Sequence, residues 1–220
     1  GRVETPLREL GPSLVVRLEN FLGAELLRAK LLCAAFPSLA GRYEIRGILG
    51  RGASGVVVRA TDFRLEREVA LKLVPVAGQA DEVLGEARTL AKLEHRHIVP
   101  VYDVELVDAV IGGESFRVAY VSMRLVEGGT MRVWLAAERR DAAAILEKYV
   151  GAGSALAAAH RAGVLHRDFK PDNVMVDSVG HAYVVDFGLA AHAAGSTSTV
   201  VSTEGHGTFP YMAPEALAGR

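Results

Sequence analysis

The sequence has little of what marks secreted or nucleic-acid-binding proteins. It contains a single cysteine, Cys33, so no disulfide can form within the chain and a reducing, cytoplasmic location is the default expectation. The formal net charge is −1, which provides no strong field to attract nucleic acid or an anionic membrane surface. We therefore expect no nucleic-acid partner.

A long uncharged apolar run is also missing. The best candidate, residues 14–36, has apolar residues at helical spacing that do not run unbroken. A membrane-spanning helix needs about 20 mostly uncharged residues. The segment therefore predicts a soluble amphipathic helix or a helix pair, and no membrane partner within this segment. Its charged residues are Arg17, Glu19, Glu25, Arg28 and Lys30.

What is present is an ordinary globular composition, with 50% hydrophobic and 23% charged residues. A length of 220 residues suits one domain with or without an extension. Pro37 and Gly41 mark the end of a first segment that carries no chemical motif. We expect residues 1–40 to form a helical extension or linker and residues 41–220 to form one domain. The start at Gly1 without a methionine suggests a fragment or a processed chain.

Patterning along the domain predicts a strand-rich first half and a helical second half. Strands are expected over residues 43–49, 56–58, 69–74, 101–106 and 116–123. Helices are expected over residues 81–93, 131–139 and 141–161. Thr130 and Asp141 carry side chains that are preferred at helix N-caps, so they are expected to begin the second and third helices.

Gly50, Gly52 and Gly55 form a G-x-G-x-x-G turn, which lets a backbone approach phosphate oxygens. In a dinucleotide-binding fold such a turn opens a helix. Here three valines, residues 56–58, follow the turn, which favours a β-hairpin. Taken alone, these residues could equally be ordinary turn glycines.

Lys72 stands inside an otherwise apolar strand, on the same face as Ala70 and Val74. A charge in that position is costly unless it meets an anion. Glu86 lies on the apolar stripe of the following helix and is the preferred partner for Lys72. Glu82, one turn earlier, is its competitor.

Two further motifs supply carboxylates and an amide. Residues 166–173 read His-Arg-Asp-Phe-Lys-Pro-Asp-Asn, and residues 186–188 read Asp-Phe-Gly after a short apolar strand at 183–185. Their oxygens suit magnesium, which prefers hard ligands. Together with the glycine turn and Lys72, they supply what is needed to hold a nucleoside triphosphate and move its terminal phosphoryl group.

From about residue 43 to residue 215 the chain resembles the eukaryotic-type serine/threonine protein kinases. The residues in its motifs are more typical of bacterial members. The resemblance implies an α+β, two-lobed fold. Its small lobe, residues 41–123, holds a five-stranded antiparallel sheet and one helix. A hinge over 124–129 leads to the first half of a mainly helical large lobe, 130–220. Kinases of this type continue well past an Ala-Pro-Glu motif such as residues 213–215, so we expect a domain truncated there.

The resemblance implies ATP and Mg²⁺ as cofactors, with Mn²⁺ as an alternative metal, and a protein substrate with a Ser or Thr acceptor. Asp168 would orient the acceptor hydroxyl, and Lys170 would neutralise charge on the transferring group. Asn173 and Asp186 would hold the metal. Lys72, aligned by Glu86, would contact the phosphates under Gly50, Gly52 and Gly55. Thr208 would contact Asp168 and Lys170.

Five side chains would surround the adenine: Val57, Ala70, Met123, Leu125 and Met175. Arg124 departs from the acidic residue commoner at its position, so backbone groups are expected to read the base. His166 would be a packing residue beside Phe187 rather than a base.

The segment between the Asp-Phe-Gly and Ala-Pro-Glu motifs has the layout of an activation segment. It contains a hydroxyl-rich run at residues 196–202. Activating phosphorylation is expected between Ser196 and Thr203, with Ser202 and Thr203 as the leading candidates. The resemblance implies that Arg167 binds the added phosphate. Self-association for this phosphorylation is a further expectation.

Three alternatives stay open. A nucleotide-binding pseudokinase or scaffold would show substitutions at Lys72, Asp168 or Asp186, and none is present. A small-molecule phosphotransferase would have glycine at Arg167 and no Ala-Pro-Glu motif. A truncated, inactive kinase fragment would keep the site residues and lack part of their scaffold.

Overall fold

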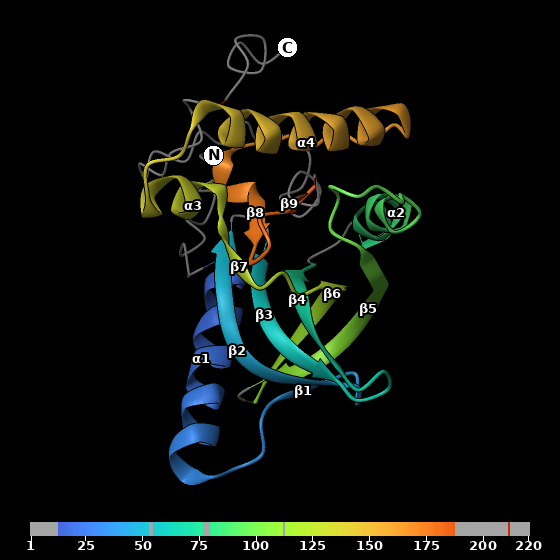
Figure 1. Ribbon diagram of the computed structural model, residues 1–220. Coiled ribbons are helices and arrows are strands. Elements are labelled where there is room, and N and C mark those ends of the chain that lie inside the picture. Colours follow the sequence, from blue (N-terminus) through green and yellow to red (C-terminus); the bar gives the residue numbers. More distant parts are fainter. Residues whose placement is uncertain (1–12, 53–54, 77–79, 112, 188–210, 212–220) are drawn as a thin grey trace, which may run out of the picture.

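The computed structural model describes residues 13–52, 55–76, 80–111, 113–187 and 211, except for the side chains of residues 80–83 and 86. Within these ranges the chain forms two lobes, one built on a curved antiparallel sheet and one dominated by helices (Figure 1). The predicted α+β, two-lobed fold is confirmed.

The small-lobe sheet has the strand order β1-β2-β3-β4-β6-β5, and every neighbouring pair is antiparallel. Its strands are β1 (Ser38–Leu39), β2 (Tyr43–Gly52), β3 (Gly55–Asp62), β4 (Arg67–Pro75), β5 (Val101–Ile111) and β6 (Glu114–Arg124). The five strands predicted for the small lobe are all found, as β2 to β6. Strand β1 lies before the predicted lobe and adds a sixth strand to the sheet; it is too short to show a period-two pattern.

The two faces of this sheet are covered by different parts of the chain. Val56 and Val58 on β3, with Leu71 on β4, point into one hydrophobic cluster. Val57 and Ala70 belong to a second cluster on the opposite face. Because successive residues of a strand alternate between faces, the valine run at 56–58 serves both layers.

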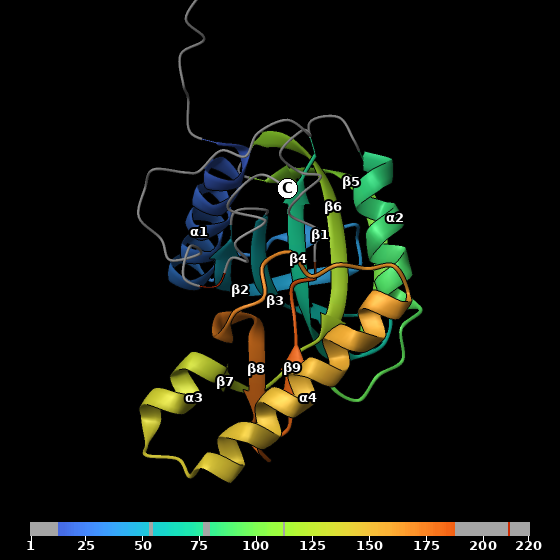
Figure 2. The same ribbon diagram turned by 90° about the horizontal axis from the view of Figure 1, so that it is seen from above.

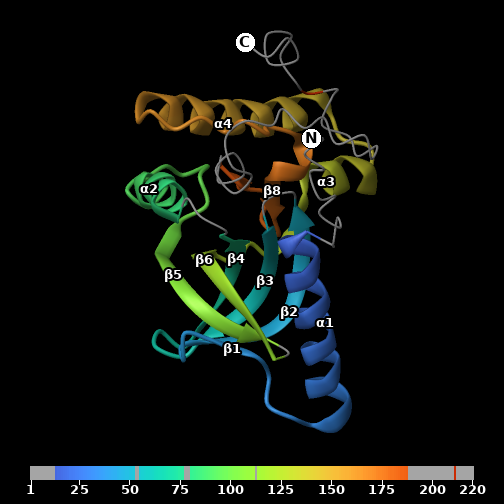
Figure 3. The same cartoon turned by 180° about the vertical axis from the view of Figure 1, so that it is seen from behind.

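Helix α1 (Leu14–Leu32) covers the first of these faces, as Figure 3 shows. It is one helix rather than a pair. Its buried residues, Leu18, Leu22, Leu26 and Ala29, form one stripe at helical spacing. Residues 14–32 therefore share a core with the sheet, and the domain division at residues 40 and 41 stays a prediction. Among the described residues, no helix is long and apolar enough to cross a membrane.

Helix α2 (Ala80–Ala91) follows β4 and matches the helix predicted over residues 81–93. The second lobe holds α3 (Met131–Ala137), α4 (Ala142–Arg161) and a 3-10 turn, η1 (Pro171–Asn173). A small sheet of β7 (Gly128–Thr130), β8 (Val174–Asp177) and β9 (Ala182–Val184) lies beside α3 and α4 (Figure 2). The Thr130 and Asp141 side chains accept hydrogen bonds from the amides of Val133 and Ala144, so both predicted N-caps are confirmed.

Strand β9 is also held against the small lobe. Ile98 pairs in parallel with Val184, whose amide donates to the carbonyl of His97 at 2.8 Å. Nearby, Arg124 donates to the hydroxyl of Tyr183 at 2.9 Å. These bonds fix the end of β9, from which Asp186 projects, relative to the strands that carry the glycine turn and Lys72.

Candidate active site

The glycine turn joins β2 to β3, with Gly52 paired to Gly55 and Gly50 to Val57. A Cβ atom on Gly55 would lie 2.2 Å from the carbonyl oxygen of Leu73, so the approach of β4 requires glycine there. A Cβ atom on Gly50 or Gly52 would meet nothing within 4 Å. Packing alone therefore does not require glycine at these two positions, and the space beside them is open.

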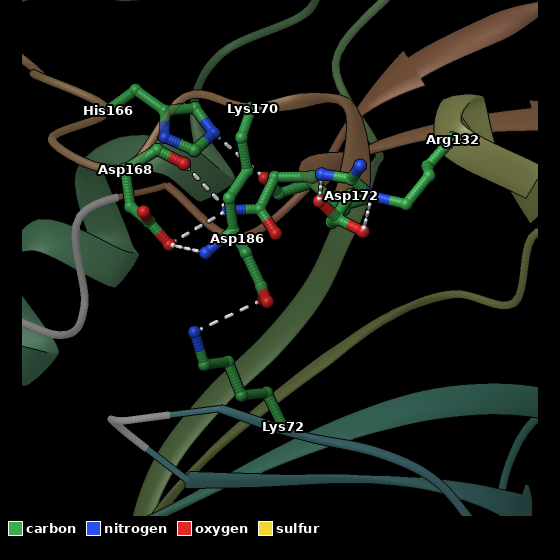
Figure 4. A network of polar contacts seen from close by, with 9 residues as sticks. Lys72, Arg132, His166, Asp168, Lys170, Asp172 and Asp186 are labelled. Atoms are coloured by element: carbon green, nitrogen blue, oxygen red, sulfur yellow. Dashed lines mark hydrogen bonds and ion pairs between the residues drawn. The ribbon is translucent and has the colours of Figure 1, made fainter. Parts of the chain in front are cut away.

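Lys72 is 4% exposed, and its Nζ lies 3.1 Å from Oδ1 of Asp186 (Figure 4). A strand of the small lobe and the segment after β9 thus meet through one ion pair. The side chains of Glu82 and Glu86 lie outside the described part of the structure. The expected pairing of Lys72 with Glu86 therefore stays a prediction.

Asp186 and Arg167 both have left-handed backbone conformations, with φ of 61° and 62°. Non-glycine residues rarely adopt this region, which costs of the order of 1 kcal/mol and concentrates at functional sites. Each of these residues stands in one of the two motifs that the sequence singles out. The local backbone is thus held in strained conformations where the polar side chains converge.

Asp168 is held by two residues of its own motif. The Nζ of Lys170 donates to its carboxylate at 2.7 Å. The Nδ2 of Asn173, a side chain that is largely buried, donates to the backbone oxygen of Asp168 at 2.7 Å and to its carboxylate at 3.2 Å. Because Nδ2 donates toward Asp168, the Oδ1 of Asn173 is left as an acceptor that could bind a metal.

His166 is buried against Phe169 and Phe187, with ring centroids 5.7 and 4.8 Å away. Its Nε2 lies 2.9 Å from the carbonyl oxygen of Val185. Burial lowers the pKa of the imidazole, because the cation would lose its hydration. A neutral ring fits the packing role expected for this residue.

Arg132 is a residue of this region that the sequence analysis missed. From the first turn of α3, its Nε and Nη2 donate to the two carboxylate oxygens of Asp172 at 2.8 and 2.7 Å (Figure 4). Hydrogen bonds to Asp172, and then to Tyr211, raise the pKa of the guanidinium. Nothing local in the sequence points to this pair, since the partners stand forty residues apart.

Four of the five predicted adenine-site residues lie in one apolar cluster: Val57, Ala70, Met123 and Leu125. Ala70 and Met123 are direct cross-strand neighbours. Met175 is not part of this cluster and pairs across the second sheet with Thr130 and Tyr183. A small pocket with a mainly apolar lining is bordered by Met123, Asp186 and Phe187.

Several predicted residues lie outside the described ranges. They are Gly188, Thr208, the candidate phosphorylation sites at 196–203, and the Ala-Pro-Glu motif at 213–215. The expectations for them stay predictions.

Comparison with known proteins agrees with the fold. The family model described as the protein kinase domain matches residues 43–220, so the chain belongs to the protein kinase family. It is similar to the serine/threonine-protein kinase PknE of Mycobacterium tuberculosis, with 38% identity over 190 residues, covering 81% of this chain and 31% of the relative.

Two other relatives give the same picture. PknL of Mycobacterium bovis, a serine/threonine-protein kinase, is 38% identical over 81% of this chain and 44% of its own length. A probable serine/threonine-protein kinase of Streptomyces coelicolor is 37% identical over 82% of this chain and 27% of its own length. The chain therefore spans less than half the length of each relative. As a class, protein kinases use ATP and a divalent metal ion and act on protein substrates.

Proposed function

We propose that this chain carries the phosphoryl-transfer site of a serine/threonine protein kinase, which uses ATP to phosphorylate Ser or Thr hydroxyls of protein substrates. The observation that carries the proposal is the convergence of two clusters. Asp168 with Lys170 and Asn173 forms one, and Lys72 with Asp186 forms the other. Phosphoryl transfer depends mainly on positioning and charge stabilisation, and these side chains supply both.

In this proposal the residues divide into a nucleotide side and an acceptor side. The open space at Gly50 and Gly52 would admit phosphate oxygens, and Lys72 would neutralise part of their charge. Asp168 would accept a hydrogen bond from the acceptor hydroxyl and orient its oxygen for in-line attack. Lys170, which already contacts Asp168, would stabilise the charge on the transferring group.

The donor set fits a hard divalent metal. Asp186 offers a partly exposed carboxylate, and Asn173 offers its amide oxygen. Among the described side chains no three of His, Cys, Asp and Glu form a metal cluster. Two protein ligands suffice where phosphate oxygens complete the coordination, as is usual for Mg²⁺. The bound metal would neutralise phosphate charge, and we propose Mg²⁺, with Mn²⁺ as a substitute.

A pseudokinase or scaffold is the rival function. It is disfavoured because Lys72, Asp168 and Asp186 are all present and are held by polar contacts. Protein substrates, self-association during activation and a cytoplasmic site of action also belong to this proposal. They rest on the family relationship and on the single cysteine.

The test is transfer from radiolabelled ATP to a generic basic protein, followed by separation of the labelled amino acids. Label on Ser or Thr that depends on Mg²⁺ is the expected result. Nucleotide binding without any transfer would favour the pseudokinase. Label on tyrosine or on a small molecule would overturn the proposed substrate class.

A further inference from the structure

The helix α1 lies before the region that matches the protein kinase family, and yet it reaches the glycine turn. The Oε2 of Glu19 lies 3.0 Å from Nη1 of Arg51, the residue between Gly50 and Gly52. We propose that Glu19 is a positioning residue that holds the glycine turn through Arg51 and so raises the affinity for nucleotide. This inference rests on the proposed function, because it assigns the turn to phosphate binding.

Glu19 is placed firmly enough to act in this way. It follows Leu18 and precedes Leu22, both of which are fully buried against the small-lobe sheet. A second ion pair, between Arg17 and Glu114, ties the same end of α1 to the start of β6. The backbone at Glu19 is thus fixed by core packing on one side of the helix and by a salt bridge two residues away.

The turn, in contrast, has few steric restraints along its first strand. Gly50 and Gly52 have open space where a Cβ atom would stand, and the pairing register of β2 with β3 shifts between Ile48 and Gly50. Arg51 is the only residue between these two glycines. Its ion pair with Glu19 links the segment to a helix outside the hairpin.

The expected effect follows from pre-organisation. A turn that is already held near its nucleotide-bound position loses less conformational entropy when ATP binds. The pair is partly exposed, with side-chain exposures of 27% for Glu19 and 50% for Arg51, so its effect is modest. Because exposed ion pairs contribute little free energy, we expect the KM and Kd for ATP to rise only about twofold to fivefold when this pair is broken. The kcat should not change.

The experiment compares Glu19→Gln, Arg51→Gln and the reversed pair Glu19→Arg with Arg51→Glu. Each is measured for KM, kcat and the Kd of a fluorescent ATP analogue at about 0.15 M salt, where distant charge effects are screened. Glu114→Gln is the matched control, because it removes the neighbouring anchor of α1 without touching the turn. Thermal melting of all variants separates loss of helix docking from loss of turn positioning.

We expect Glu19→Gln to raise KM and Kd at constant kcat, the reversed pair to recover most of that loss, and Glu114→Gln to leave both constants unchanged. An unchanged Kd in Glu19→Gln would overturn the inference while leaving the proposed function intact. An equal rise of KM and Kd in Glu114→Gln would also overturn the inference, because it would show that the general docking of α1 is responsible. A wild-type chain that does not bind ATP would overturn the inference together with the proposed function.

Discussion

Lys72 and Asp186 meet between the two lobes, with Nζ of the lysine 3.1 Å from Oδ1 of the aspartate. Lys72 comes from β4 in the small lobe, and Asp186 follows β9 in the large lobe. The lysine is almost fully buried, so the carboxylate offsets a charge that would otherwise be costly. In the proposed function the same carboxylate binds the metal, which places both partners around the phosphates.

Asp186→Ala should weaken nucleotide binding mainly in the presence of Mg²⁺. In the proposed function the carboxylate would act on the phosphates through the metal, so we expect a loss of at least about tenfold with Mg²⁺ and a much smaller loss in EDTA. Titration of a fluorescent ATP analogue under both conditions measures this. Equal losses in both conditions would show that Asp186 serves only to neutralise Lys72.

Asp168→Asn should reduce phosphoryl transfer by at least about a hundredfold while largely preserving the Kd for ATP. The amide has almost the same shape, so the bonds from Lys170 and Asn173 can be kept in part, but it cannot accept a proton as a carboxylate does. Steady-state transfer and equilibrium nucleotide binding should be measured on the same preparation. Undiminished turnover would remove Asp168 from its assigned role.

Arg132→Ala should lower the rate of phosphoryl transfer by about tenfold. A misplacement of the reacting groups by about 1 Å can lower the rate by about a hundredfold, and we expect a smaller displacement here. The reason is that Asp172, which Arg132 binds with two bonds, immediately precedes Asn173. Loosening this turn should also raise the Mg²⁺ concentration needed for half-maximal activity. Arg132→Lys should recover the activity only in part, because lysine cannot form the two-bond fork.

The control for Arg132 is Arg59→Ala. Arg59 also binds a carboxylate, that of Glu68, from its Nε at 2.7 Å, but the two partly exposed side chains lie on β3 and β4 of the small-lobe sheet. Unchanged Mg²⁺ dependence in both variants would contradict the positioning role of Arg132.

Asp62→Asn should destabilise the fold by about 3 kcal/mol, because it breaks a buried ion pair from one side. Asp62 has no exposed surface and accepts hydrogen bonds from Arg42 at 2.9 and 2.8 Å. These bonds hold the pKa of the carboxyl below its usual value. Chemical unfolding of both proteins at pH 7 gives the difference in free energy of unfolding.

The same pair predicts a pH dependence. A carboxyl whose pKa is lowered on folding stabilises the protein at pH values above its unfolded pKa of about 3.9, and this contribution is lost as the pH falls through the lower folded value. The difference between wild type and Asp62→Asn should therefore be constant near neutral pH and shrink below about pH 4. A difference that stays constant down to pH 2 would show that folding does not change the pKa of Asp62, and hence that Arg42 does not stabilise its ionised form.

Phosphorylation between Ser196 and Thr203 should activate the enzyme, with Ser202 and Thr203 as the leading sites. Each phosphate adds a charge of about −1.5 to −2 for Arg167 to bind. Mass spectrometry of active protein, followed by alanine replacement, tests this. Full activity after removal of every hydroxyl in the run would refute it. A dependence of the phosphorylation rate on protein concentration would support self-association.

Much of this protein could be predicted from residues that are close in sequence. The valines at 56–58 favoured a hairpin after the glycine turn, because the strand preference of β-branched side chains is a local property of the sequence. Thr130 and Asp141 predicted the start of two helices, because an N-cap side chain accepts hydrogen bonds only from amides of the following turn. The order of the four motifs along the chain also indicated the kinase family.

Only the tertiary structure decided which residues that are distant in sequence contact each other. The apolar spacing over residues 14–36 predicted a helix or a helix pair, but not the sheet face that Leu18, Leu22 and Leu26 cover, because many apolar surfaces could bury them equally well. The bonds of Glu19 to Arg51 and of Arg132 to Asp172 depend on how whole elements are placed. Charged side chains show no periodic signal of their partner in the sequence. Such pairs form where the packing of the apolar cores brings the elements that carry them together.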